Sequence, residues 1–302
     1  MKSTTTVPHQ LGFSFSPGGL LLPYHLGVMD SLDLAGHLTE RTPVAGASAG
    51  AIAVACHACG IPSAKVLDAT VALVKECELA GGPRGRLIPA LRRQMAQIIG
   101  QEEIERLQNR PGPVGIAYQE LFPLRRSVVQ TMFTSPDDLM DAVSFSSTFP
   151  FFSDRWPVAV DRRQSFPKLV VDGFFSVPRE RFGCPDLSQI TANATQQGET
   201  QKRVDEVLVA CFPREKMGLT AVSADRCISP TENAFDDAVV FNSENKEEQS
   251  TFGIANFIQI AMEACPPSTY FDVYERGLAD GEAWSLKLSE SSWAPPAHTP
   301  LN

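Results

Sequence analysis

Gly46-Ala47-Ser48-Ala49-Gly50 stands between a β-type stretch at residues 43–46 and a run of small apolar residues at 51–59. This order predicts a strand, a sharp turn and a buried helix. The turn fits the pattern G-x-S-x-G, in which small neighbours let the chain turn sharply and leave the serine oxygen exposed at the end of the strand. Ser48 is therefore the candidate nucleophile, and Gly46 and Gly50 are the small residues that the turn requires.

A second glycine turn precedes this one. Residues 11–16 alternate apolar and polar side chains and run into Pro17-Gly18-Gly19, and residues 22–32 then carry leucines and a methionine at helical spacing. Free N–H groups at the start of a helix stabilise a negatively charged oxygen. Gly18 and Gly19 are thus candidates for an oxyanion hole, and a plain strand-to-helix loop is the alternative.

Strand and helix patterns continue to alternate along the chain, which predicts an α/β fold with a layered sheet. The segments that favour strands are residues 114–118, 127–133, 168–171 and 206–212, and those that favour helices are 63–75, the stretch after Ser135, 252–264 and 270–287. Asp172 ends the strand at 168–171, and parallel sheets collect functional groups at such ends. A buried carboxylate with a raised pKa can act as a base directly, so Asp172 is the candidate base. An ordinary aspartate at a strand-to-turn junction is the alternative.

The histidines do not offer a clear base for Ser48. The α/β-hydrolase order of serine, acid and histidine requires His298, which lies in a proline-rich tail, and only two short strands precede Ser48. The remaining histidines are His9 in the polar start and His25, His37 and His57 near the first helices. The α/β-hydrolase fold is disfavoured, although a histidine-dependent serine esterase stays open as a second kind of enzyme.

Taken together, the first glycine turn, the early G-x-S-x-G and the later Asp-Gly resemble the patatin-like phospholipases, in order as well as in type. Residues 26–28, 46–50 and 171–173 look closest to the adiponutrin and triglyceride-lipase branch of that family. Residues 146–152 are similar to its serine-rich segment with a proline. The resemblance covers about residues 11–287.

The resemblance implies a three-layer α/β/α sandwich with a mainly parallel central sheet, and a lipid acyl-ester hydrolase of the phospholipase A or triacylglycerol lipase kind. Ser48 would attack the ester carbonyl and Asp172 would carry the proton, with no metal and no organic cofactor. The amides of Gly18, Gly19 and Ala49 would bind the oxyanion. Phe149, Phe151 and Phe174 are expected to line the pocket. The rival class is a catalytically weak or silent lipid-binding or regulatory protein.

The amino-acid composition limits the binding partners and the compartment that we expect for this chain. The net charge of -9 and pI near 5.1 argue against nucleic acid. Seven scattered cysteines suit a reducing, cytoplasmic compartment. No apolar run reaches the ~18 to 20 residues of a transmembrane segment, so any contact with a membrane or lipid-droplet surface is expected to be peripheral. We expect one domain at residues 11–290, between a flexible segment at 1–10 and a proline-rich tail at 291–302.

Two further motifs bear on these expectations. Residues 79–101 contain four arginines and no acid, with apolar residues recurring on one side of a helix begun at Pro89. This pattern fits an interfacial helix or flap over the acyl pocket. The alternative is an amphipathic helix packed on the core, which is favoured because most surface helices have this pattern. Cys56-His57-Ala58-Cys59 lacks a second pair of ligands with suitable spacing, so packing residues are expected there in place of a zinc site.

Overall fold

The computed structural model describes residues 9–195, 203–235 and 253–290. Within these residues eight strands form one sheet in the order β5-β6-β3-β2-β1-β7-β8, and β4 pairs with β3 off this path. The strands are β1 (His9–Phe15), β2 (Val44–Ala47), β3 (Val114–Phe122), β4 (Arg126–Gln130), β5 (Ala159–Asp161), β6 (Lys168–Val171), β7 (Arg203–Val209) and β8 (Cys227–Ile228). Strands β1, β2, β3, β7 and β8 are parallel, whereas β4, β5 and β6 join antiparallel to their neighbours. The predicted α/β fold with a mainly parallel central sheet is confirmed.

Both faces of the sheet are covered, which explains why its central strands are almost wholly apolar. Alternate residues of a strand point to opposite faces. Phe13 and Phe15 of β1 enter the larger core, together with Val207 of β7. On the other face, Ala45 of β2 packs against Leu187 and Ile190, close to the helix α7 (Ser188–Thr195).

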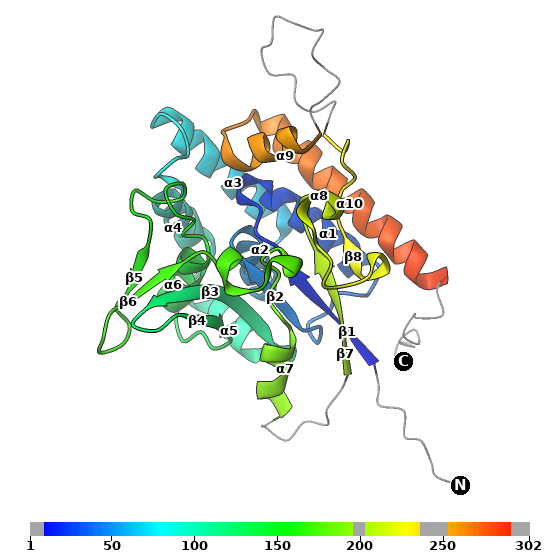
Figure 1. Ribbon diagram of the computed structural model, residues 1–302, viewed down its shortest axis with the longest axis horizontal. Coiled ribbons are helices and arrows are strands. Elements are labelled where there is room, and N and C mark those ends of the chain that lie inside the picture. Colours follow the sequence, from blue (N-terminus) through cyan, green and yellow to red (C-terminus); the bar gives the residue numbers. More distant parts are fainter. Residues whose placement is uncertain (1–8, 196–202, 236–252, 291–302) are drawn as a thin grey trace, which may run out of the picture.

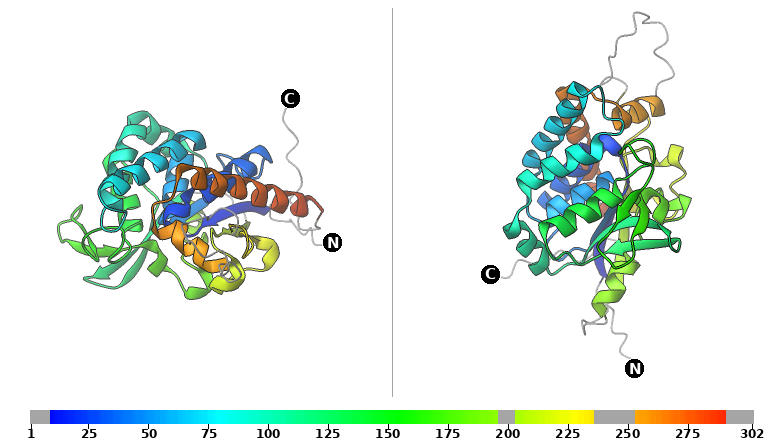
Figure 2. Two further views of the ribbon diagram at one scale, coloured as in Figure 1. Left: turned by 90° about the horizontal axis from the view of Figure 1, so that it is seen from above. Right: turned by 90° about the vertical axis from the view of Figure 1, so that its left-hand side faces the viewer.

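Most helices lie on the larger core. They are α1 (Leu22–Leu34), α2 (Ala49–Ala58), α3 (Ser63–Leu79), α4 (Leu87–Ile98), α5 (Gln101–Asn109), α6 (Pro136–Ser146), α9 (Gly253–Met262) and α10 (Pro267–Glu290). Helix α10 packs along α1, so the last described helix closes the core over the first (Figure 1). The antiparallel strands β4, β5 and β6 project at the opposite end of the molecule from α10, as two further views show (Figure 2).

Local signals in the sequence placed most of these elements. The predicted cap at Ser135 is present, because its Oγ accepts from the N–H of Asp138 at 3.1 Å. β7 was expected at residues 206–212 and ends instead at Val209. β1 already begins at His9, within the predicted flexible segment at 1–10. Residues 1–8 and the predicted tail at 291–302 lie outside the described residues.

None of the described helices combines the length and the apolar character that a bilayer crossing requires.

Candidate active site

Ser48 occupies a strained turn between β2 and α2. Its φ of 54° lies in the left-handed region, which non-glycine residues seldom adopt. A Cβ on Gly46 would lie 2.2 Å from the carbonyl oxygen of Gly50, and one on Gly50 would lie 2.4 Å from that of Phe15. Both glycines are therefore required for α2 to start so close to β1 and β2. The turn has the local geometry that the pattern G-x-S-x-G predicts.

The two edges of β3 explain how Asp172 comes near Ser48. β4 pairs with residues 116–120 of β3 along one edge. β2 pairs with residues 114–117 and β6 with residues 119–122, so these two strands lie end to end along the other edge. β2 is parallel to β3 and β6 is antiparallel, so their carboxyl ends converge beside Tyr118. Ser48 follows one of these ends and Asp172 follows the other.

This arrangement corrects one step of the sequence argument. Asp172 does end a strand, as expected, but β6 is antiparallel to β3 and not a member of the parallel set. Contact between the two turns is close, because a Cβ on Gly173 would lie 2.7 Å from the Cβ of Ala47. The meeting of two opposed strand ends therefore produces the proximity that a parallel edge was expected to provide.

The carboxyl of Asp172 is almost fully buried, at 1% exposure. Burial raises its pKa to about 7, and the N–H of Phe174 and the nearby hydroxyl of Ser48 limit this rise. Oδ1 accepts from the N–H of Phe174 at 2.8 Å, whereas the buried Oδ2 has no partner of standard geometry among the described residues. No hydrogen bond of standard geometry joins the Ser48 hydroxyl to Oδ2, and catalytic hydrogen bonds are often long or poorly aligned in unliganded active sites.

The glycine turn lies beside Ser48, and contacts to the carbonyl of Ser16 fix the start of the turn. The carbonyl of Ser16 accepts from the N–H of Gly50 at 3.1 Å and lies 2.8 Å from Nε2 of His25. A carbonyl can only accept, so Nε2 of His25 carries the proton. Gly18 has no room for a side chain, because a Cβ there would lie 2.2 Å from Sγ of Cys211. Gly19 has a φ of 56°, which suits glycine.

The predicted oxyanion donors share one cavity with Ser48. Gly18, Gly19 and Ala49 all line this cavity, whose volume is about 300 Å³. Within the described part of the chain, no hydrogen bond takes up the N–H groups of these three residues. Ala49 begins α2 and Gly19 begins the short 3₁₀ helix η1 (Gly19–Leu21), so their amides are among the free donors of a helix start.

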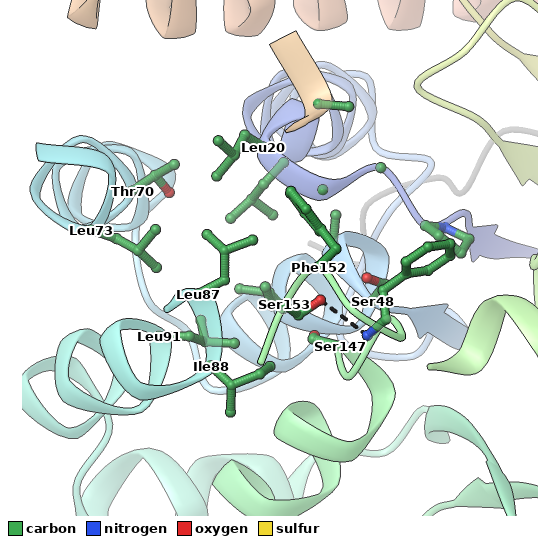
Figure 3. A pocket seen from close by; sticks show the side chains of 18 of the residues that line it. Leu20, Ser48, Thr70, Leu73, Leu87, Ile88, Leu91, Ser147, Phe152 and Ser153 are labelled. Carbon is green, nitrogen blue, oxygen red and sulfur yellow. Dashed lines mark hydrogen bonds between the residues drawn. The ribbon is translucent and has the colours of Figure 1, made fainter. Parts of the chain in front are cut away.

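The cavity is largely apolar away from Ser48. In Figure 3, Ser48, Ser147 and Ser153 lie toward one end, and Thr70, Leu73 and Leu91 toward the other. The apolar walls come from α3, α4 and α9, through Val66, Leu73, Leu87, Ile88, Leu91, Met95, Ile98, Ile258 and Met262. Such a chamber accommodates a hydrocarbon chain better than a polar substrate.

Two of the three phenylalanines expected in the pocket line it. Phe149 and Phe174 do so, and their rings stand 6.2 Å apart in an edge-to-face arrangement. Phe151 does not, since it is 72% exposed with a φ of 61°, and Phe152 lines the cavity in its place. The left-handed backbone at Phe151 turns that side chain outward, which periodicity in the sequence could not reveal.

Residues 13–181 match the sequence model of the family described as patatin-like phospholipase, which is more than half of the chain. The chain belongs to the patatin-like phospholipase family. Members of this family are lipid acyl hydrolases. No curated protein matches the sequence.

Solved structures similar to this patatin-like chain include VipD from Legionella pneumophila, with 10% identity and a TM-score of 0.44 over 91% of this chain and 67% of VipD. The heterodimeric ExoU–SpcU complex from the type III secretion system of Pseudomonas aeruginosa has 14% identity and a TM-score of 0.42, over 94% and 60%. A structure of the type III effector protein ExoU has 13% identity and a TM-score of 0.40, over 93% and 54%. This chain thus spans from about half to two thirds of their length, and the family assignment rests on the sequence match.

No histidine among the described residues lines the patatin-like cavity. Burial lowers the pKa of His25 and of His57 to about 4, which keeps both imidazoles neutral. His25 holds the Ser16 carbonyl, and His57 faces a separate polar cavity with Arg106 and Arg110. The side chains of His9 and His298 lie outside what the structure describes.

Helix α4 lies within residues 79–101, for which the sequence left two interpretations. Its apolar side lines the cavity through Leu91 and Met95, while Arg92 pairs with Asp141 and Arg93 with Glu76. The helix is therefore packed on the protein and forms a wall of the patatin-like cavity. The seven cysteines, Cys56 and Cys59 included, are free and buried.

Sequence reasoning missed several residues around the nucleophile. Ser146 holds the backbone of Ser48, Ser147 lines the cavity with a buried Oγ that has no partner among the described residues, and Ser153 binds the N–H of Phe149 at 3.0 Å. Ser146 and Ser147 lie in the serine-rich segment at residues 146–152 that carried part of the resemblance, and Ser153 directly follows it. The serines are visible in the sequence, but the role of each hydroxyl depends on contacts that only the folded structure shows.

Proposed function

We propose that this chain hydrolyses acyl esters of lipids, with Ser48 as nucleophile and Asp172 as its only proton-transfer partner. The observation that carries the proposal is the convergence of β2 and β6 on β3, which puts the Ser48 turn beside a buried carboxyl. The apolar cavity and the unused amides around Ser48 support it. A pKa of about 7 gives the carboxyl a useful base strength near neutral pH.

In the proposed reaction, Oγ of Ser48 attacks the ester carbonyl carbon while the carboxylate of Asp172 takes the hydroxyl proton. The N–H groups of Gly18, Gly19 and Ala49 bind the oxygen that becomes negative. Protonated Asp172 returns the proton to the leaving alcohol as the C–O bond breaks, which leaves an acyl-Ser48 ester. Asp172 then removes a proton from water as the water oxygen attacks the acyl carbon. It returns this proton to Oγ of Ser48 as the acyl–Oγ bond breaks, which releases the fatty acid and restores both Ser48 and the Asp172 carboxylate.

The silent lipid-binding protein is the second candidate. The observation in its favour is that Oδ2 of Asp172 lacks a standard hydrogen bond to Ser48. A fluorophosphonate probe separates the two candidates, because it reacts only with an activated serine. We expect wild type to label and Ser48→Ala not to label. Ser147→Ala is the matched control, since it removes another hydroxyl from the same cavity and should still label.

Hydrolysis of a panel of phospholipids, galactolipids and triacylglycerols tests the base and names the lipid class. Asp172→Asn should lower the rate by about 10²- to 10⁴-fold, the usual contribution of a general base. A folded wild type that neither labels nor hydrolyses any lipid would favour the silent binder. Loss of activity on replacing His25 with unchanged stability, together with an active Asp172→Asn, would favour a histidine-dependent esterase.

Three finer expectations belong to the same proposal. Membership of the adiponutrin and triglyceride-lipase branch, based on residues 26–28, 46–50 and 171–173, is a prediction from motifs. One catalytic domain at residues 11–290 and residence in the cytoplasm are likewise predictions. Fractionation of the native cell, with the chain followed by antibody, tests the last of these.

A further inference from the structure

Exposed apolar side chains concentrate in one part of the chain. Nine of the fourteen large apolar residues that are exposed among the described residues lie within 121–175. Seven of them stand at the end of β3 or on the β3–β4 turn, on the loop between α6 and β5, or on the β5–β6 hairpin. We call these seven the apolar edge: Leu121, Phe122, Leu124, Phe151, Trp156, Val160 and Phe166. The strands that carry it project at the end of the molecule opposite α10 (Figures 1 and 2).

Two structural features fix parts of the apolar edge. Phe151 has a φ of 61°, a conformation that bulky residues rarely adopt, and is 72% exposed. The rings of Phe122 and Phe166 stand 5.9 Å apart and tie the β3–β4 turn to the β5–β6 hairpin. The exposure of aromatic rings to water is unfavourable, and a group of exposed rings marks a binding surface.

Positive charge accompanies the apolar edge although the whole chain has a net charge of -9. Arg126 and Lys168 pair with Glu120. Arg163 pairs with Asp138 and Asp161. Within the described ranges no carboxylate pairs with the other cations of these segments, which are Arg125, Arg155 and Arg162. Aromatic rings interspersed with unpaired guanidinium groups complement the headgroup region of an anionic lipid surface.

The apolar edge is continuous with the catalytic cavity through the loop between α6 and β5. Phe149 lines the cavity, stacks on the exposed Phe175 at 5.6 Å, and stands two residues before Phe151. Phe152 and Ser153 line the cavity as well. One short loop therefore has its inner side in the cavity and its outer side at the apolar edge.

We propose that the apolar edge, with Arg125, Arg155 and Arg162, docks this protein on an anionic lipid surface from which the substrate enters the cavity. The route from bilayer to Ser48 then follows the loop at residues 149–156. This inference rests on the proposed lipid hydrolysis for its substrate, but the docking step is measurable without catalysis. It assigns membrane contact to the antiparallel end of the sheet and not to α4.

Binding of the full chain carrying Ser48→Ala to vesicles tests the docking step. We expect co-sedimentation with phosphatidylcholine vesicles that contain phosphatidylserine, and weaker binding at high salt because the charges are exposed. Adding Phe151→Ser and Trp156→Ser should weaken binding by about tenfold or more, since two rings then no longer enter the lipid. Replacing the three arginines by glutamine should remove the dependence on phosphatidylserine. Phe271→Ser on α10 and Arg41→Gln are the controls, and both should bind as before.

Activity assays keep this test separate from the test of the dyad. In an otherwise wild-type chain, Phe151→Ser with Trp156→Ser should leave kcat/KM on a soluble short-chain ester unchanged and lower the rate on vesicle lipid. Absence of ester hydrolysis in every variant would reject the dyad, while vesicle binding by Ser48→Ala would still support the apolar edge. Equal vesicle binding by the edge variants and the controls overturns the docking proposal. So does a dimer that these edge substitutions convert to a monomer, because a second copy is then the occupant.

Discussion

Ser146 fixes the nucleophile turn by accepting a hydrogen bond at its Oγ from the N–H of Ser48 at 2.9 Å. The same hydroxyl donates to the carbonyl of Ala117 on β3 at 2.6 Å. One buried side chain therefore joins the strained turn to the strand on which Asp172 also converges. The hydroxyl gives its only proton to Ala117 and is fully buried, so it acts on the geometry of Ser48 and not on the substrate.

Ser146→Ala should lower kcat and the rate of fluorophosphonate labelling by about tenfold, because a strained turn then loses its anchor. It should also reduce the free energy of unfolding by about 1–3 kcal/mol, since the N–H of Ser48 stays buried without an acceptor. Ser144→Ala is the control, because that hydroxyl donates within α6 to Met140 and does not touch the turn. Equal labelling rates in both variants at matched stability would contradict the role of Ser146.

The turns of this protein were predictable because their causes are local. Gly46 is needed because a Cβ there would meet the backbone of Gly50, four residues later, and the cap at Ser135 acts on Asp138. Short patterns of this kind determine the local backbone geometry by themselves. The strand, turn and helix around Ser48 therefore followed from the sequence almost to the residue.

The residues that meet those turns in the folded protein were less predictable. Their positions depend on pairing between strands that are far apart in the sequence. Nothing local distinguishes a strand such as β6 that joins antiparallel from one that joins parallel, so Asp172 was found by an argument that the topology corrects. Ile258 and Met262 reach the cavity from α9, about 210 residues beyond Ser48. Only the assembled core brings such residues together.

The pH dependence of kcat/KM on a neutral soluble ester should follow the ionisation of Asp172. Its carboxyl must be charged to accept the proton of Ser48, and burial raises its pKa to about 7. Activity should therefore rise about tenfold per pH unit below pH 7 and level off above it. His25 and His57 have pKa values of about 4, so a profile that is still flat at pH 5 would contradict Asp172 as the base.

Asp172 should also make the protein less stable as the pH rises. Below about pH 4 the carboxyl is protonated in both the folded and the unfolded chain, so it contributes no pH dependence. Between about pH 4 and its folded pKa of about 7, only the folded state keeps the proton, and the free energy of unfolding falls with rising pH. Asp172→Asn should lack this decline and gain up to roughly 4 kcal/mol over wild type above pH 7. Urea unfolding at several pH values measures the difference, and parallel curves for the two proteins would contradict the raised pKa.

Gly19→Ala tests the glycine turn against a matched control elsewhere in the chain. Gly19 and Gly36 have φ values of 56° and 74°, so alanine at either position should suffer a similar backbone penalty of about 1 kcal/mol. Only at Gly19 does the new Cβ also meet an obstacle, the carbonyl oxygen of Ala261 at 2.3 Å, whereas the space around Gly36 is open. Gly19→Ala should therefore displace the turn and lower kcat by about 10²-fold, the effect of losing one oxyanion donor, while Gly36→Ala loses a little stability and keeps full activity. If both variants retained the wild-type kcat, the amide of Gly19 would have no part in binding the oxyanion.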